Sequence, residues 1–229
     1  MFGAKEKVNR YDHWLDKYPF DPSEEGMILM YGHSLFTRWG HPKWGYRRMD
    51  EDIRAKDGSL AVVNHGFGTS TSEELLYYYD RMVRPWEPRA LVVATYSNDG
   101  MYGYSPEQIM DVLARLLAWA RTDFPGIKLF IVEPHPCPSG KDATIKDLWN
   151  NAKHKREKFI EMIHIYAQTH EDTKVIELWN QPELFETPED VGNFRKVRDD
   201  IFVEDKVHPN QAGYDILGPI FRKALDELL

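Results

Sequence analysis

Ser34, Asp205 and His208 are the residues of this sequence whose types and positions suit nucleophilic chemistry. Ser34 follows an apolar run at 27–31, and a serine at the end of a buried strand can attack a substrate when a base takes its proton. Asp205 lies three residues before His208, and Pro209 ends the turn. The carboxylate can then hold one imidazole nitrogen and leave the other free to act as that base.

The residues around this set predict an alternation of strands and helices. Apolar runs predict strands at 27–31, 60–63, 90–95, 127–132 and 174–178, and helical patterns follow at about 72–84, 105–124, 144–170 and 211–228. Such alternation is typical of a parallel sheet with helices on both faces, joined by right-handed crossovers. We expect one domain over 1–229, with residues 1–25 as an extended lead-in packed on it.

Parallel strands carry their following loops to one edge of the sheet, where ligands bind in open α/β folds. Three polar loops follow the first three predicted strands: Gly32-His-Ser34, Asn64-His-Gly66 and Ser97-Asn-Asp99. The segment Asp205-Lys-Val-His208 comes just before the last predicted helix. We therefore expect these four segments to meet.

Taken together, the four segments resemble the SGNH hydrolases, also called GDSL-type esterases. The blocks are Ser34 in Gly-His-Ser-Leu, Gly66 in Asn-His-Gly-Phe-Gly, Asn98 in Ser-Asn-Asp-Gly and His208 in Asp-Lys-Val-His-Pro-Asn, and the match spans residues 27 to about 225. Two positions depart from the family pattern. His33 stands where the family usually has aspartate, and Ser97 stands where it often has glycine.

The resemblance implies an α/β fold: a three-layer α/β/α sandwich with a five-stranded, parallel, flavodoxin-like sheet. It implies that Ser34 is the nucleophile, His208 the base and Asp205 the group that orients the base. It also implies an oxyanion hole built from the backbone N–H groups of Ser34 and Gly66 and the side-chain amide of Asn98. This chemistry uses no cofactor, and we expect none.

Aromatic and histidine side chains near the strand ends are candidates for contacts with a substrate. They are His33, His65, Trp39, Tyr102 and His135. Packing in the core or on the surface is the alternative for each ring. A three-histidine metal site from His33, His65 and His208 is a further alternative. Neither His33 nor His65 has a familiar ligand spacing, and the pairing of His208 with Asp205 is the better use of that residue, so we expect no metal.

Composition narrows the class of protein. The net charge of −8 over 229 residues, without a basic stripe, argues against a nucleic-acid partner. No apolar run is long enough to span a membrane, the N-terminal 17 residues lack a signal-peptide core, and Cys137 is the single cysteine. We therefore expect a cytoplasmic location.

The expected activity is hydrolysis of carboxylic esters with short acyl groups, such as acetyl on a sugar, so the expected partner is a small ester derived from a carbohydrate or a lipid. A thioesterase, a lysophospholipase or an acyltransferase would use the same residues. A non-catalytic module that binds carbohydrate through its aromatic loops is the alternative outside enzymes. The sequence leaves the acyl-chain length and the oligomeric state open.

Overall fold

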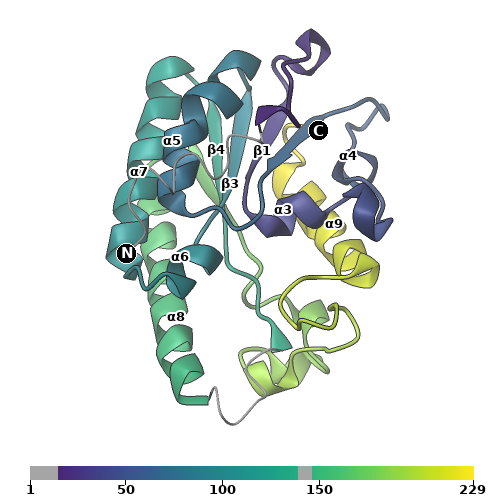
Figure 1. The fold of residues 1–229 in the computed structure, drawn as a ribbon, viewed down its shortest axis with the longest axis vertical. Helices are drawn as coiled ribbons and strands as arrows, with labels where there is room; N and C mark the ends of the chain where they lie inside the picture. Colours follow the sequence, from purple (N-terminus) through teal and green to yellow (C-terminus); the bar gives the residue numbers. More distant parts are fainter. Residues whose placement is uncertain (1–14, 139–145) are drawn as a thin grey trace.

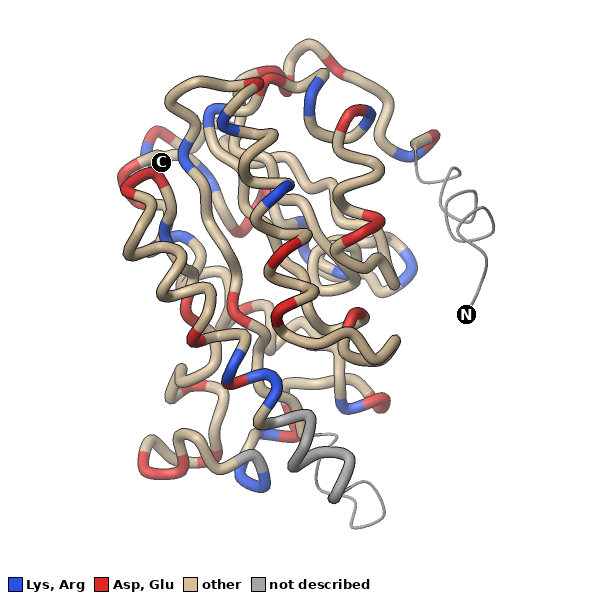
Figure 2. The backbone as a smooth tube through the Cα atoms, turned by 90° about the vertical axis from the view of Figure 1, so that its left-hand side faces the viewer, with Lys and Arg blue, Asp and Glu red and all other residues tan. Residues whose placement is uncertain are grey.

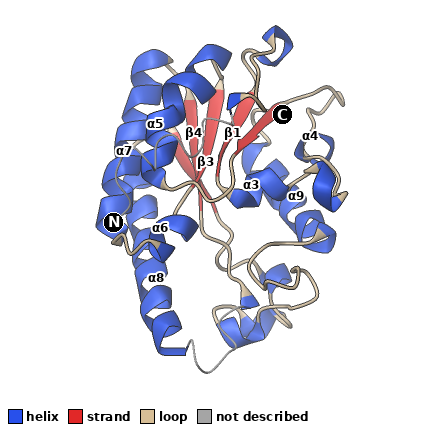
Figure 3. Ribbon diagram, in the orientation of Figure 1, coloured by secondary structure: helices blue, strands red, loops and turns tan. Residues whose placement is uncertain are grey.

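A five-stranded parallel sheet forms the centre of the molecule (Figures 1 and 3). The structure is a computed structural model that describes residues 15–138 and 146–229. The strand order is β2-β1-β3-β4-β5, which is the flavodoxin-like, doubly wound order. The strands are β1 (Ile28–Gly32), β2 (Val62–Gly66), β3 (Ala90–Ala94), β4 (Lys128–Val132) and β5 (Thr173–Ile176).

Helices cover both faces of the sheet and make the two outer layers (Figure 1). One core cluster joins the sheet to α5 (Ser72–Met82), α7 (Pro106–Asp123) and α8 (Lys146–Gln168). A second cluster joins the opposite face to α3 (Ser34–Arg38), α4 (Met49–Asp52) and α9 (Gln211–Leu225). The three-layer α/β/α fold expected from the sequence is confirmed.

The strands β1 and β3 read as unbroken apolar runs because both of their faces are covered. Every residue of β1 and of β3 is buried. The helices α7 and α9 begin with side-chain caps: the Ser105 side chain accepts the backbone N–H of Gln108 at the start of α7, and the Asn210 side chain accepts that of Gly213 at the start of α9. The predicted alternation of strands and helices is therefore present in the structure.

Strand β2 differs from the prediction, since it extends to Gly66 instead of ending at residue 63. Its last residues stay in register with β1, with Gly66 beside Gly32. Asn64 is a polar residue inside this strand, and its side-chain amide finds partners there because it donates to the carbonyls of Phe36 and Trp39. The loop after β2 therefore begins at residue 67, three positions later than the apolar run suggested.

Short helices occupy two segments that the sequence indicated as loops. Residues 97–99 belong to α6 (Ser97–Met101), and the chain directly after Ser34 forms α3. Between β5 and α9 the chain makes three 3-10 turns, at Pro182–Leu184, Pro188–Asp190 and Phe194–Lys196. A small apolar cluster holds this region together: Cys137, Leu184, Phe185, Val197, Ile201 and Phe202.

The predicted lead-in is described only from residue 15, so its first 14 residues lie outside the described residues. From residue 15 to 25 the chain contains a 3-10 turn, Pro22–Glu24, and packs beside β2, where the Tyr18 hydroxyl donates to the Gly66 carbonyl. Acidic and basic residues are interspersed on the side of the molecule in Figure 2. None of the helices within 15–138 and 146–229 has the length and apolar character to cross a membrane.

Candidate active site

Ser34, His208 and Asp205 form a hydrogen-bonded line at the carboxyl edge of the sheet. The His208 Nε2 atom lies 2.8 Å from Ser34 Oγ, and its Nδ1 atom lies 2.8 Å from Asp205 Oδ2. Because a carboxylate can only accept, Nδ1 carries the proton and Nε2 is left to accept the serine O–H. This is the geometry that the sequence predicted for the three residues.

Asp205 is held in place by its own loop. Its Oδ1 atom accepts the backbone N–H groups of Val207 and His208, both at 2.9 Å. Partial burial raises the pKa of this carboxyl, but the two N–H donors and the His208 side chain outweigh that effect and lower the pKa to about 2. Asp205 is therefore ionised at neutral pH.

His208 is poised to be neutral. Burial lowers the pKa of its imidazole, and the charge of Arg38 lowers it further, while the hydrogen bond and charge of Asp205 act in the opposite direction. The net shift of the pKa is downward. A neutral imidazole with a free Nε2 lone pair is what a general base at neutral pH requires.

Arg38 is a fourth member of this network. Its Nη1 atom lies 3.2 Å from Asp205 Oδ2, the same oxygen that accepts from His208. Its guanidinium also stacks over the Trp44 ring, 4.9 Å from the centroid. Arg38 ends the helix that Ser34 begins, so one short helix supplies both Ser34 and a cation beside Asp205.

Ser34 stands at the first position of α3, where a backbone N–H has no partner inside the helix. His33, the preceding residue, caps this helix: its Nδ1 atom accepts the Leu35 N–H at 3.3 Å. His33 is 4% exposed, and burial together with the nearby His135 and His208 lowers its pKa to about 3. The histidine at the position of the usual family aspartate is thus a neutral helix cap.

Asn98 lies in α6, at the end of β3. Its Nδ2 atom donates one hydrogen bond to the Ser70 carbonyl at 2.8 Å, which leaves the second amide hydrogen of that nitrogen available. The neighbouring Asp99 is fully buried and ties this helix to the start of α5, since its Oδ1 atom accepts both the N–H and the hydroxyl of Ser72. Asn98 is therefore held on a braced turn.

The N–H group of Gly66, predicted as an oxyanion donor, has a partner within the edge strand: it donates to Asn64 Oδ1 at 3.0 Å. A Cβ atom at this position would lie 2.4 Å from the backbone nitrogen of Thr37 and 2.6 Å from Phe36 Cβ. The lack of a side chain at Gly66 therefore lets α3 pack closely on β2.

The five candidates for substrate contacts have different places. Trp39 is 2% exposed, donates to Asp52 and stacks on Tyr214, so its ring packs in the core. His65 is 1% exposed and packs between Tyr18 and Trp86 rather than beside Ser34. Tyr102 is largely exposed, at the end of α6.

His135 lies against the loop that carries the base. Its Nε2 atom donates to the Val207 carbonyl at 3.0 Å, and its ring stacks on Phe202. Burial lowers the pKa of His135 to about 4, so it stays neutral at pH 7. His135 therefore supports the loop that carries His208, as His33 supports the helix that carries Ser34.

The alternative of a metal centre finds no support in the part of the chain that the structure describes. Within 15–138 and 146–229, no three His, Cys, Asp or Glu side chains are arranged to hold an ion. His33, His65 and His208 each have a separate environment: a helix cap, the Met82 carbonyl and Asp205 respectively.

Two residues of the site were missed by sequence reasoning. Asp99 stands in the predicted polar loop 97–99, where an acidic residue next to an asparagine at a strand end can anchor the chain. Arg38 contacts Asp205 across 167 residues of sequence, and no local pattern signals such a pair.

Comparison with known proteins agrees with this geometry. The GDSL-like Lipase/Acylhydrolase family model matches residues 30–216, which include all three triad positions. A search among curated protein sequences finds no match.

Solved structures share the fold at low sequence identity. A GDSL-like lipase from Bacteroides thetaiotaomicron superposes with a TM-score of 0.68 at 18% identity, covering 97% of this chain and 98% of that one. A lipase/acylhydrolase from Enterococcus faecalis has a TM-score of 0.62 at 16% identity, covering 88% and 95%. A lipolytic G-D-S-L protein from Veillonella parvula has a TM-score of 0.59 at 19% identity, covering 87% and 98%. With a family match over most of its length and this fold, the chain belongs to the GDSL-like lipase/acylhydrolase family.

Proposed function

We propose that this protein is a serine esterase that hydrolyses small carboxylic esters with short acyl groups. The observation that carries the proposal is the continuous chain of hydrogen bonds from Asp205 through His208 to Ser34. Membership of an acylhydrolase family supports the reaction class. The short acyl chain rests on the sequence alone, which contains no long apolar segment that could serve as a lid.

In this proposal Ser34 Oγ attacks the ester carbonyl carbon while His208 Nε2 takes the serine proton. Asp205 keeps the imidazole in the tautomer with its proton on Nδ1 and stabilises the imidazolium that forms. The tetrahedral intermediate expels the alcohol, which receives the proton from His208. A water molecule, activated by the same imidazole, then hydrolyses the acyl-serine.

The negative charge on the carbonyl oxygen needs donors that are already in place. We assign this role to the backbone N–H of Ser34 and the second amide hydrogen of Asn98. Gly66 is left out because its N–H is used by Asn64. Loss of one such donor costs roughly 3–4 kcal/mol of barrier, so Asn98→Ala should lower kcat by two to three orders of magnitude.

The test is hydrolysis of p-nitrophenyl esters from acetyl to dodecanoyl. The wild type should turn over the shortest esters fastest, and Ser34→Ala should lose activity by about 10⁴-fold or more. Ser97→Ala is the matched control, because Ser97 is a partly exposed serine after the neighbouring strand β3. Its variant should keep the wild-type rate.

Active-site labelling separates the proposal from a narrow substrate range. A fluorophosphonate should add covalently to Ser34 in the wild type and in Ser97→Ala, but not in Ser34→Ala, as read by intact mass and peptide mapping. A folded wild type that neither turns over any ester nor accepts the label would refute the serine mechanism.

A further inference from the structure

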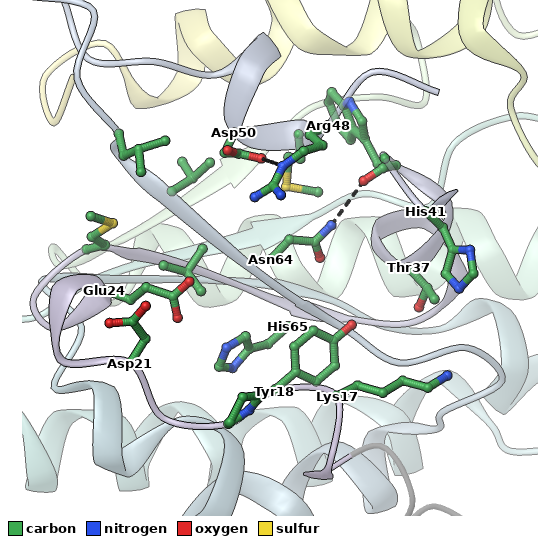
Figure 4. Close-up of a pocket in the computed structure, with 18 of the residues that line it drawn as sticks. Lys17, Tyr18, Asp21, Glu24, Thr37, His41, Arg48, Asp50, Asn64 and His65 are labelled. Carbon is green, nitrogen blue, oxygen red and sulfur yellow. Dashed lines mark hydrogen bonds and ion pairs between the residues drawn. The ribbon is translucent and has the colours of Figure 1, made fainter. Parts of the chain in front are cut away.

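A cavity of about 550 Å³ lies along β2, the strand at the edge of the sheet (Figure 4). Its volume is in the range of small-molecule sites. Residues 62–65 of β2 form one wall, and the segment 17–24 lies across from them. None of Ser34, Asn98, Asp205 and His208 lines it, so this cavity is separate from the candidate active site.

His65 presents an unused hydrogen-bond acceptor to this cavity. The ring is 1% exposed, and its Nδ1 atom lies 2.7 Å from the Met82 carbonyl. A carbonyl can only accept, so Nδ1 carries the proton and Nε2 has a lone pair. Within residues 15–138 and 146–229, no hydrogen bond to that Nε2 atom is formed. Burial also lowers the pKa of His65 to about 4, which keeps the ring neutral at pH 7.

Two carboxylates lie in the same half of the cavity as His65. Figure 4 shows Asp21 and Glu24 pointing toward one another there. Glu24 is half-buried, and burial followed by the charge of Asp21 raises its pKa. Its Oε2 atom accepts the Trp86 indole N–H at 3.2 Å. This end of the cavity therefore offers acceptors and negative charge.

The cations of the lining offset only part of this negative charge: the charge of Arg48 lowers the pKa of Glu24, but the net shift of that pKa is upward because burial outweighs it. Arg48 is engaged by Asp50, with 2.7 Å between Nε and Oδ1. Lys17 extends toward the opposite end of the cavity from Asp21 and Glu24 in Figure 4. The rest of the lining is mostly apolar and includes Met27, Met49, Leu60, Val62 and Val63.

From this arrangement we propose that the β2-edge cavity is a second ligand site, which binds an organic ammonium compound with an apolar body. The ammonium group donates to His65 Nε2 and to the carboxylates of Asp21 and Glu24, and the apolar part packs on the aliphatic side chains. An anion or a pure acceptor finds no complementary group at that end, because every polar group there accepts.

The probe for the test is 2-phenylethylamine, with 2-phenylethanol as its neutral counterpart of the same shape. Each is titrated into ¹⁵N-labelled protein at pH 7 and followed through backbone amide shifts. We expect the amine to shift the amides of residues 62–65, with a Kd on the order of 1 mM for a ligand of about nine non-hydrogen atoms. The alcohol should bind at least tenfold more weakly.

Two variants with the same change of charge locate the site. Glu24→Gln removes a carboxylate but keeps an oxygen for the Trp86 N–H, and it should weaken amine binding about tenfold. Glu25→Gln changes the adjacent, exposed glutamate, which does not line the cavity, and should leave the Kd unchanged. The spectra of the unliganded variants verify that both are folded.

Three results would overturn the proposal: equal affinity for the amine and the alcohol, equal effects of Glu24→Gln and Glu25→Gln, or shifts confined to the loops around Ser34 and Asn98. The measurement reads binding and not turnover. The test of the ligand site is therefore independent of the outcome of the esterase assay.

Discussion

Replacing Arg38 by methionine should raise the pKa of His208 and move the acid limb of the pH–rate profile upward. Arg38 and His208 contact the same oxygen, Asp205 Oδ2, at 3.2 Å and 2.8 Å, so the two nitrogen atoms are at most 6.0 Å apart. A protonated His208 is repelled by the guanidinium at this distance. Removing the Arg38 guanidinium therefore favours the protonated form of His208, and the Asp205 carboxylate then interacts with His208 without competition from Arg38.

The size of the shift follows from Coulomb's law. Two unit charges 6 Å apart repel by about 0.7 kcal/mol at the dielectric constant of water, and by about twice that at half this dielectric. Arg38 and His208 have about one fifth of their side chains exposed, which places the pair between these limits. We therefore expect the pKa of His208 to rise by about 0.5 to 1 unit.

Two measurements check this shift. The acid limb of kcat/KM reports the pKa of the base in the free enzyme. The imidazole proton signals of His208, followed by NMR, report the same pKa without turnover. Above both pKa values the variant should keep most of its rate, because Asp205 is still held by the N–H groups of Val207 and His208.

Lys43→Met is the matched control. Lys43 also lies over the Trp44 ring, 5.6 Å from its centroid, but it makes no ion pair with Asp205. This variant should leave the pKa of His208 within about 0.2 units of the wild type, a change expected of a screened, distant charge. An acid limb that stays in place or moves downward in Arg38→Met would refute the reasoning.

Two further predictions concern stability. Gly66→Ala should lower the free energy of unfolding by about 1–3 kcal/mol in urea denaturation, because its Cβ would lie 2.4 Å from the Thr37 backbone nitrogen. Gly100→Ala is the control and should be neutral, because a Cβ there has only a 3.9 Å contact to Tyr96. Equal effects of the two substitutions would contradict the packing role of Gly66. Acidification should also destabilise the fold. Burial lowers the pKa of His33 to about 3 and those of His65 and His135 to about 4, whereas a histidine of the unfolded chain has a pKa of about 6.5. Between these pKa values the unfolded chain therefore binds more protons than the folded protein, and stability falls as the pH falls. From pH 7 to pH 5 each histidine should cost roughly 2 kcal/mol, and a urea midpoint that is unchanged or higher at pH 5 would rule this out.

Much of the fold and the contact between Asp205 and His208 could be predicted because the signals are local. Strands such as β1 and β3 are buried on both faces and appear as continuous apolar runs. Asp205 and His208 are three residues apart, so their contact depends on one turn. The placing of Ser34 beside them follows from the rule that loops after parallel strands share an edge.

The errors have a common cause in contacts between distant segments. Asn64 and Gly66 have the composition of a loop, but hydrogen bonds from Asn64 to the chain around α3 keep them in the sheet. This placed the end of β2 at Gly66, three residues beyond the end of the apolar run. Trp39 shows that an aromatic ring near a strand end can equally belong to the core, which only the packing decides.

The order in which the chain is synthesised has a consequence for the triad. Ser34 and His208 are 174 positions apart, and α9, which follows His208 directly, packs on the helix of the nucleophile: the Tyr214 hydroxyl donates to the Leu35 carbonyl, and its ring stacks on Trp39. A ribosome that has released the first four strands has released Ser34 but neither His208 nor the helix α9 that packs on α3. Protein translated at about 5–20 residues per second therefore lacks the contact between Ser34 and His208 until α9 docks. Ester turnover would thus report that the whole domain has closed.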